Sequence, residues 1–295
     1  MTSLLSKVKS RLFIRSRRHA FHQLDGQYSS QARGRGTDFD DLREYAVGDD
    51  VRDIDWKATA RSNTTLLRRF HPERRHVMTF VVDSGRSMSA VTRERESKSD
   101  LLISVVGSLA YLATRHGDDA AMLYRGALAV ERIAPGRSDS HLERMLRAVQ
   151  AATTRTAPAG DLARILGQAA KTMRRRGLVV CVSDEAAIAP ESIDALRALR
   201  TRHDVYWVSV GDAVFGGRGD RVSTVVDVAS GWSVPAFLLA GKDAVGTAVR
   251  ARAERRHTNA QVLEGLGIVH TTIQSEGELL PSLVTLMSKS GRTRG

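Results

Sequence analysis

Residues 76–83 read His-Val-Met-Thr-Phe-Val-Val-Asp, an apolar and β-branched run that ends at an acid. Residues 178–184, Leu-Val-Val-Cys-Val-Ser-Asp, and residues 205–212, Val-Tyr-Trp-Val-Ser-Val-Gly-Asp, have the same form. Short runs of this composition predict buried strands. Because an acid follows each strand, we expect the acids to lie at the carboxyl edge of a parallel sheet, where ligands bind in open α/β folds.

Helices are predicted between these strands, because apolar residues recur there at the spacing of one helix face. Leu101, Val105, Leu109 and Leu112 form the first such stripe, and residues 142–149, 162–173, 193–199 and 279–287 carry others. Alternating strands and helices are typical of an α/β fold with a mainly parallel sheet. We therefore predict one three-layer, Rossmann-like domain over residues 76–290, followed by a tail at 291–295.

The composition favours acidic partners and a reducing compartment. Forty-five Lys and Arg against 33 Asp and Glu give a formal net charge of +12, which attracts polyanions. Cys181 is the single cysteine and follows an apolar run, so we predict a buried, reduced thiol. The longest apolar run, residues 101–113, is shorter than the roughly 20 residues that cross a bilayer. We expect a cytoplasmic protein, with contact to the inner face of the membrane as an open alternative.

Residues 1–24 form a basic leader. Its basic residues before the first acid, Asp25, are Lys7, Lys9, Arg11, Arg15, Arg17 and Arg18. One interpretation is an amphipathic helix that binds acidic lipid or nucleic acid. The other, which we favour, is a solvated basic helix or a frayed end, because chain termini are usually poorly ordered.

Residues 25–75 lack apolar periodicity. Several glycines alternate there with a dense mixture of charges. Such a segment cannot bury a core of its own, so we expect it to pack on the domain that follows.

Motifs of several enzyme classes are absent from the sequence, including a phosphate loop, a His-Glu-x-x-His zinc helix and a paired-cysteine metal site. Residues 85–89, Gly-Arg-Ser-Met-Ser, match only part of the nucleophile elbow of serine hydrolases, since the last position is not glycine. His270 is the only plausible base for such a serine. Because the motif is incomplete and lacks its usual structural context, serine hydrolysis is disfavoured.

The same segment is better interpreted as a cation site. Asp83 and Ser87 follow the first strand, and Asp184 follows a later one. Magnesium prefers oxygen ligands, keeps several waters and needs only one or two carboxylates. We predict a Mg²⁺ site formed by Asp83, Ser87 and Asp184, with an open position for an acid of a partner.

Residues 83–88, Asp-Ser-Gly-Arg-Ser-Met, after a strand resemble the von Willebrand factor type A domain. That family has an adhesion site of pattern Asp-x-Ser-x-Ser, with a later Thr and Asp, that binds a divalent cation. The resemblance implies that Asp83, Ser87 and Asp184 are metal ligands. Gly85 and Gly160 stand where the middle Ser and the Thr belong, so two oxygen ligands are lost.

Two outcomes of this loss stay open. Ser84 or Asp161 would supply the missing oxygens, or the site has decayed into a helix cap in which Ser87 and Asp161 are N-caps.

A longer signature covers residues 34–61. It includes Gly-Arg-Gly-Thr-Asp-Phe at 34–39, Leu-Arg-Glu-Tyr at 42–45 and Gly-Asp-Asp-Val-Arg-Asp-Ile-Asp-Trp-Lys-Ala-Thr-Ala-Arg at 48–61. This signature is similar to that of the bacterial domain-of-unknown-function 58 family, in which it precedes a type A-like domain. Members are often encoded beside MoxR-type AAA+ ATPases, so the resemblance implies a role as an adaptor or client of such a motor.

The signature has two physical interpretations. In the first, Arg-carboxylate pairs and a buried Trp56 hold the segment in place. In the second, Arg52, Trp56 and Arg61 form a recognition face, because Trp and Arg dominate interface hot spots.

Three functional hypotheses follow. The first is a non-enzymatic protein-interaction module that docks an AAA+ ATPase or another protein client. The second is a basic adaptor on nucleic acid or anionic membrane, for which charge alone predicts salt-sensitive, non-specific binding. The third is a metal-dependent hydrolase using Asp83 and Asp184, which lacks an evident general base or nucleophile.

Overall fold

The computed structural model describes residues 3–14, 17–36, 42–46, 49–62, 64–68, 76–213, 224–226, 228, 233–235 and 242–290. The predicted tail at 291–295 and residues 37–39 and 48 of the signature lie outside these ranges. Among the described helices, none is both long and apolar enough to cross a membrane.

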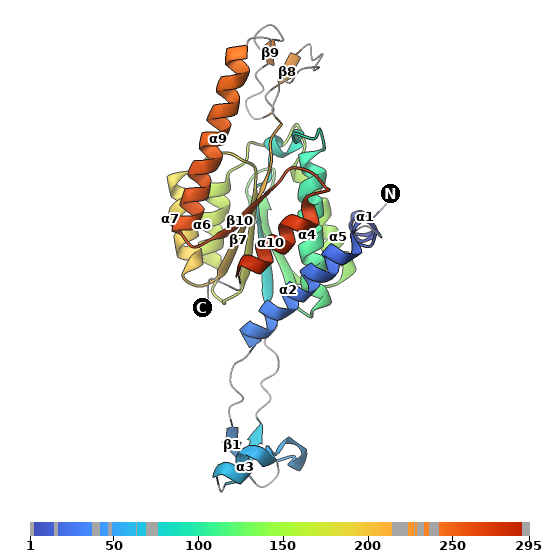
Figure 1. Cartoon of the computed structure of the whole chain (residues 1–295), viewed down its shortest axis with the longest axis vertical. Helices are drawn as coiled ribbons and strands as arrows, with labels where there is room; N and C mark the ends of the chain where they lie inside the picture. The colour runs from blue at the N-terminus through green and yellow to red at the C-terminus, as the bar shows by residue number, and fades with distance from the viewer. Residues whose placement is uncertain are drawn as a thin grey trace.

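A six-stranded sheet forms the centre of the molecule (Figure 1). Its order is β10-β7-β6-β3-β4-β5, and every neighbouring pair is parallel except β4 with β5. The strands are β3 (Val77–Val82), β4 (Asp119–Arg125), β5 (Val130–Gly136), β6 (Leu178–Ser183), β7 (Asp204–Val210) and β10 (Val269–Ile273). The prediction of an α/β fold with a mainly parallel sheet is confirmed.

The sheet is buried on both faces because its side chains alternate along each strand. In β3, Met78, Phe80 and Val82 join the larger apolar cluster, whereas Val81 joins the cluster on the opposite face. Cys181 of β6 lies in this second cluster and is fully buried, which confirms its predicted place in the core.

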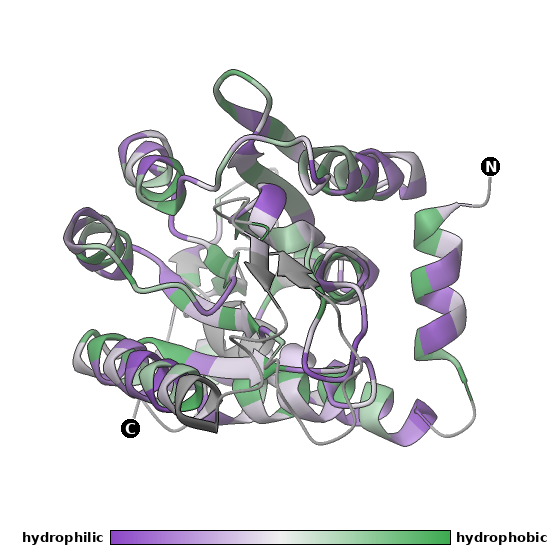
Figure 2. Cartoon of the chain, turned by 90° about the horizontal axis from the view of Figure 1, so that it is seen from above, coloured by the Kyte–Doolittle hydropathy of each residue, from purple (hydrophilic) through white to green (hydrophobic). Residues whose placement is uncertain are grey.

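Helices cover the two faces. On the face of the larger cluster lie α4 (Lys98–Arg115), α5 (Asp139–Ala152) and α10 (Leu279–Ser290). On the other lie α6 (Leu162–Thr172), α7 (Pro190–Arg200) and α9 (Lys242–Gly265). A short antiparallel pair, β8 (Thr224–Val226) and β9 (Ser233–Pro235), precedes α9. Figure 2 shows that the helices carry both hydrophobic and hydrophilic segments, as expected of helices with one face on a sheet.

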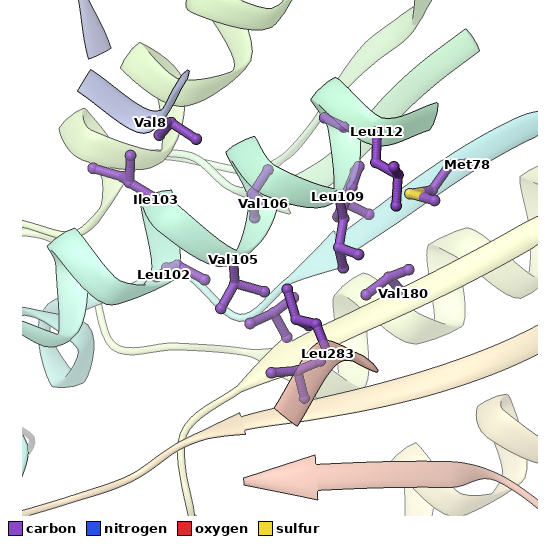
Figure 3. Packing of buried hydrophobic residues seen from close by; sticks show 14 of the residues in the cluster. Val8, Met78, Leu102, Ile103, Val105, Val106, Leu109, Leu112, Val180 and Leu283 are labelled. Carbon is purple, nitrogen blue, oxygen red and sulfur yellow. The ribbon is translucent and has the colours of Figure 1, made fainter. Parts of the chain in front are cut away.

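The basic leader is part of this core. Helix α1 (Leu4–Leu12) contacts α4 and α5, and its residues Leu4, Leu5, Val8 and Leu12 are buried. Gly107 of α4 permits the close approach, since a Cβ there would lie 2.9 Å from Cγ2 of Val8. Figure 3 shows Val8 beside Ile103 of α4. The expectation of a solvated or frayed leader is wrong, because the apolar residues of α1 pack against α4 and α5.

Three cations of the leader, two of them in α1, also pair with acids of the same chain. Lys9 lies 2.7 Å from Asp139, and Arg11 and Arg17 lie 3.1 and 3.3 Å from Glu276. At the start of the helix, Glu143 of α5 accepts hydrogen bonds from the backbone N–H groups of Leu4 and Leu5 and from the Ser3 hydroxyl. These bonds satisfy donors that a helix N-terminus otherwise leaves open.

Helix α2 (Arg18–Gly36) continues from the leader across the predicted boundary at residue 25. It packs on α10 and buries Phe21, Leu24 and Tyr28. The hydroxyl of Tyr28 donates to Asp118 over 2.6 Å. The first two helices therefore belong structurally to the sheet domain.

The signature folds as a small separate unit that we call the signature unit. It consists of β1 (Leu42–Glu44), the 3-10 helix η1 (Val51–Asp53), α3 (Trp56–Ser62) and β2 (Leu66–Arg68), with β1 antiparallel to β2. In Figure 1 it stands apart from the sheet, below α2. The expectation that residues 25–75 pack on the sheet domain is met in α2, where Tyr28 is buried, whereas the described residues of the signature unit stand apart in Figure 1. Within that unit the buried Leu67 pairs with Ile54 and Arg43.

Candidate functional site

Three acids meet at the carboxyl edge of the sheet. Asp83, Asp184 and Asp212 follow β3, β6 and β7, which are adjacent parallel strands. The backbone N–H of Asp83 donates to Val182 over 2.8 Å, which fixes the end of β3 against β6. The topology therefore brings together acids that lie far apart in the sequence.

Asp83 is the most buried of the three. Burial, followed by the charge of Asp184, raises the pKa of its carboxyl from 3.8 to about 8, although Lys98 lowers it in part. Its Oδ1 is buried and has no hydrogen-bond partner within the described part of the chain. At neutral pH, Asp83 is thus mainly a neutral carboxylic acid.

Two loops approach each other closely beside Asp83. Gly85 has a positive φ of 155°, and a Cβ on it would lie 2.5 Å from the backbone nitrogen of Gly160. A Cβ on Gly160 would lie 2.6 Å from Oδ1 of Asp83. Glycine is therefore needed at both positions where the type A resemblance expects a hydroxyl, and this packing leaves no room for one.

Ser84 and Asp161, the two residues predicted to supply the missing oxygen ligands, already form other hydrogen bonds. The hydroxyl of Ser84 donates to the Arg125 carbonyl and accepts from the Arg125 N–H, each over 2.8 Å. Asp161 accepts the N–H of Arg164 over 3.1 Å and is the N-cap of α6. The predicted capping role of Asp161 is confirmed.

Ser87 does not cap a helix in the predicted way. It lies inside the 3-10 helix η2 (Arg86–Ser89), whose N-cap is Gly85. The N-cap of the following helix, α4, is Ser97. The loop between η2 and α4 separates Ser87 from the helix start that it was expected to cap.

Lys98 was missed by the sequence analysis and lies among the acids. Its side chain is 1% exposed, and its Nζ lies 2.5 Å from Oδ1 of Asp212 and 4.0 Å from Oδ2 of Asp184. A buried lysine is rare unless it is paired. Here the ammonium supplies a positive charge at the point where the strand ends converge.

A second buried ion cluster adjoins the first. Glu185 is 1% exposed and lies 2.5 Å from Nε of Arg252 and 3.5 Å from Nε of Arg256, both on α9. The N–H of Asp212 also points to Glu185, over 3.4 Å. The charges at this edge therefore tie α9 to the ends of β6 and β7.

The described residues do not fit a divalent cation at Asp83, Ser87 and Asp184. Oδ1 of Asp184 accepts the Ala186 N–H over 2.8 Å, and its Oδ2 faces Lys98. Within the ranges that the structure describes, no group of three or more His, Cys, Asp or Glu side chains could hold a metal. A Mg²⁺ site at these residues therefore stays a prediction of the sequence.

A serine-hydrolase geometry is absent at Ser87. His270 lies on β10, and β7 and β6 separate this strand from β3. At about 4.8 Å per strand, this places His270 on the order of 14 Å from the end of β3. Nε2 of His270 lies 3.6 Å from Oε1 of Glu264. His270 cannot act as the base for Ser87.

The signature residues lie elsewhere, on the signature unit. Trp56 begins α3 and is 69% exposed, so the interpretation that it is a buried anchor is wrong. Arg52 and Arg61 are exposed as well. Two neighbouring acids bind backbone N–H groups: Asp50 accepts the Arg52 N–H, and Asp55 accepts the Lys57 and Ala58 N–H groups in the first turn of α3.

The signature unit exposes several further large apolar side chains. Val51 is 60% exposed, and Leu42 and Tyr45 are also exposed. Isolated exposed apolar residues are common on proteins, whereas their concentration on one small unit is a feature of interaction surfaces.

One family match spans both the signature unit and the strand-end acids. The family model described as "Protein of unknown function DUF58" matches residues 41–214, more than half of the chain. The uncharacterized protein Rv1480 of Mycobacterium tuberculosis is 28% identical over 275 residues, which are 91% of this chain and 84% of that protein. Uncharacterized protein Mb1516 of Mycobacterium bovis gives the same values.

Two solved structures are similar at a lower level. A von Willebrand factor type A protein from Catenulispora acidiphila has a TM-score of 0.41 and 11% identity; the match covers 77% of this chain and 44% of that one. An aerotolerance-related membrane protein from Bacteroides fragilis has a TM-score of 0.39 and 12% identity, over 73% of this chain and 99% of that one. The matched family range includes Trp56 and the strand-end acids from Asp83 to Asp212, and this chain belongs to the DUF58 family.

Proposed function

We propose that this protein is a non-enzymatic adaptor or client that docks on a AAA+ ATPase of the MoxR type through its signature unit. The observation that carries the proposal is the exposure of Trp56, 69%, on a unit that stands apart from the sheet. Exposure of a large aromatic side chain to water is unfavourable. Burial of this surface against a partner therefore contributes favourable free energy to binding.

The surroundings of Trp56 support a docking role. Val51 and Tyr45 add exposed apolar area on the same unit, and Arg52 and Arg61 add exposed guanidinium groups. Interface hot spots combine Trp, Tyr and Arg in this way. The complementary surface on the ATPase would offer an apolar pocket with carboxylates at its rim.

The non-enzymatic part of the proposal is supported by the strand-end site. Asp83 is buried beside close-packed loops, and Asp184 and Asp212 are engaged with Lys98. Among the described residues at this edge, no serine lies beside a histidine base. Serine hydrolysis needs the nucleophile and its base within hydrogen-bond reach of each other.

The basic-adaptor alternative has less support. The leader cations Lys9, Arg11 and Arg17 face acids of the same chain, and the apolar face of α1 is covered by α4 and α5. Insertion of α1 into a membrane would expose this part of the core.

The test is a binding titration of the full chain against the purified MoxR-type ATPase from the same organism, with Trp56→Ala as the variant. We expect an affinity loss of at least about tenfold, since truncation of a hot-spot Trp costs about 2 kcal/mol or more. Leu128→Ala is the matched control, because Leu128 is 91% exposed on the sheet domain. Equal affinities of the wild type and Trp56→Ala would contradict the proposal, provided that both chains unfold at the same temperature.

A further inference from the structure

Lys98 occupies an unusual position for a lysine. It is the first residue of α4, and its backbone N–H donates to the Ala90 carbonyl over 3.0 Å. The side chain then runs inward and leaves only 1% of its surface exposed. Lysine is almost never buried to this extent without a paired anion, so the surrounding charges must compensate the ammonium.

The compensating groups are the strand-end acids. The ammonium lies 2.5 Å from Asp212 after β7 and 4.0 Å from Asp184 after β6, while its charge also acts on Asp83 after β3. One side chain thus pairs with acids at the ends of two neighbouring strands, β6 and β7. Asp184 is 11% exposed and Asp212 is 34% exposed, so solvent screens the contact with Asp184 little.

A divalent cation at Asp83 and Asp184 would compete directly with this ammonium. Two positive centres within a few ångströms of each other in a buried site repel strongly. The packing of Gly85 against Gly160 also removes the hydroxyl ligands that would help to retain the metal. These carboxyl groups are therefore better suited to bind the ammonium of Lys98 than a hydrated divalent cation.

We propose that Lys98 replaces a divalent cation at the carboxyl edge of this sheet, so that the site is held together by a built-in ammonium and is independent of metal. The pairing with Asp212 and Asp184 fixes α4 against β6 and β7. This role concerns the fold of the site and does not depend on the ATPase partner, so the two proposals fail separately.

The first experiment asks whether the wild-type chain binds a divalent cation. Mn²⁺ is titrated into the purified full chain and followed by electron paramagnetic resonance, and thermal unfolding is recorded in EDTA and in millimolar MgCl₂. We expect no tight Mn²⁺ site and equal unfolding temperatures. A stoichiometric Mn²⁺ site that Asp184→Asn abolishes would overturn the proposal.

The second experiment removes the ammonium. Lys98→Met should lower the unfolding temperature, because breaking a buried ion pair leaves an uncompensated charge. Mg²⁺ should then restore part of the loss in this variant alone. Lys171→Met is the control, since Lys171 is exposed on α6. If Lys98→Met is as stable as this control, the ammonium has no such role.

A further variant covers the case in which Lys98→Met does not fold. The double variant Lys98→Met with Asp212→Asn removes one charge of each sign, so it should fold and be more stable than Lys98→Met alone. Failure of the second substitution to recover any stability would argue against charge compensation as the role of Lys98.

Discussion

Glu143 links the leader to the sheet domain, and its substitution gives a quantitative test of that link. The carboxylate accepts from the Leu5 and Leu4 N–H groups over 2.8 and 3.0 Å, and from the Ser3 hydroxyl over 2.8 Å. Burial acts to raise the pKa of Glu143, but these hydrogen bonds and one from Arg147 together lower it from 4.5 to about 2.

The size of the effect follows from this pKa. One pKa unit is worth about 1.4 kcal/mol, so a fall from 4.5 to about 2 corresponds to about 3 kcal/mol of folding free energy. The side chain is 24% exposed, and screening by water reduces this figure. We expect about 1–2 kcal/mol to be lost in Glu143→Gln, because the Leu4 and Leu5 N–H groups point at different carboxylate oxygens and one of these becomes an NH2 donor.

The pH dependence of this loss has a definite sign. Because the folded pKa lies below the unfolded one, the ionised Glu143 stabilises the fold fully above about pH 4.5, and the contribution disappears as the pH falls toward 2. The difference in unfolding free energy between the wild type and Glu143→Gln should therefore shrink over this window.

The assay is urea unfolding followed by circular dichroism at a series of pH values, with hydrogen exchange of residues 3–14 as a local measurement. Glu254→Gln is the control, because Glu254 is exposed in the middle of α9. Exchange in α1 should rise in Glu143→Gln and stay unchanged in the control. A stability difference that is constant with pH, or the same exchange in α1, would refute the reasoning.

Three further substitutions or reagents test the packing of the core. Gly107→Ala should cost about 1–3 kcal/mol in thermal unfolding, because the new methyl group meets Val8 at 2.9 Å; a neutral effect would mean that α1 shifts freely. Tyr28→Phe should cost about 1–2 kcal/mol through the lost bond to Asp118, and an unchanged unfolding midpoint would contradict this. Cys181 should stay unreactive to a thiol reagent until the chain unfolds, because burial raises the pKa of its thiol; fast labelling of the native protein would contradict its burial.

The central strands were predictable from sequence because each carries enough apolar residues to be buried on both faces. Strand β5 was not, since it is the edge strand and most of its residues, such as Glu131 and Arg132, are exposed or half-buried. The leader was misjudged for a related reason. Its six basic residues dominate the composition, whereas Leu4, Val8 and Leu12, at helical spacing, decide its packing.

The strand-end site was predictable only in part. The acids were visible because each directly follows an apolar run, and parallel strands bring such ends together. Nothing local to Lys98 indicates burial, because its partners Asp184 and Asp212 lie far away in the sequence. The exposure of Trp56 was equally hidden, since a tryptophan in a charged segment can be either an anchor or an interface residue.

The packing of α2 against α10 bears on the synthesis of the chain. These two helices lie far apart in the sequence, and both contribute to the larger apolar cluster, α2 through Phe21 and Leu24 and α10 through Leu283 and Leu286. A ribosome releases α2 long before α10, so for much of its synthesis the nascent chain carries the apolar face of α2 without its contacts to α10. Chains that stop before residue 279 would keep that surface exposed, and aggregation or capture by a chaperone is the expected fate of such products.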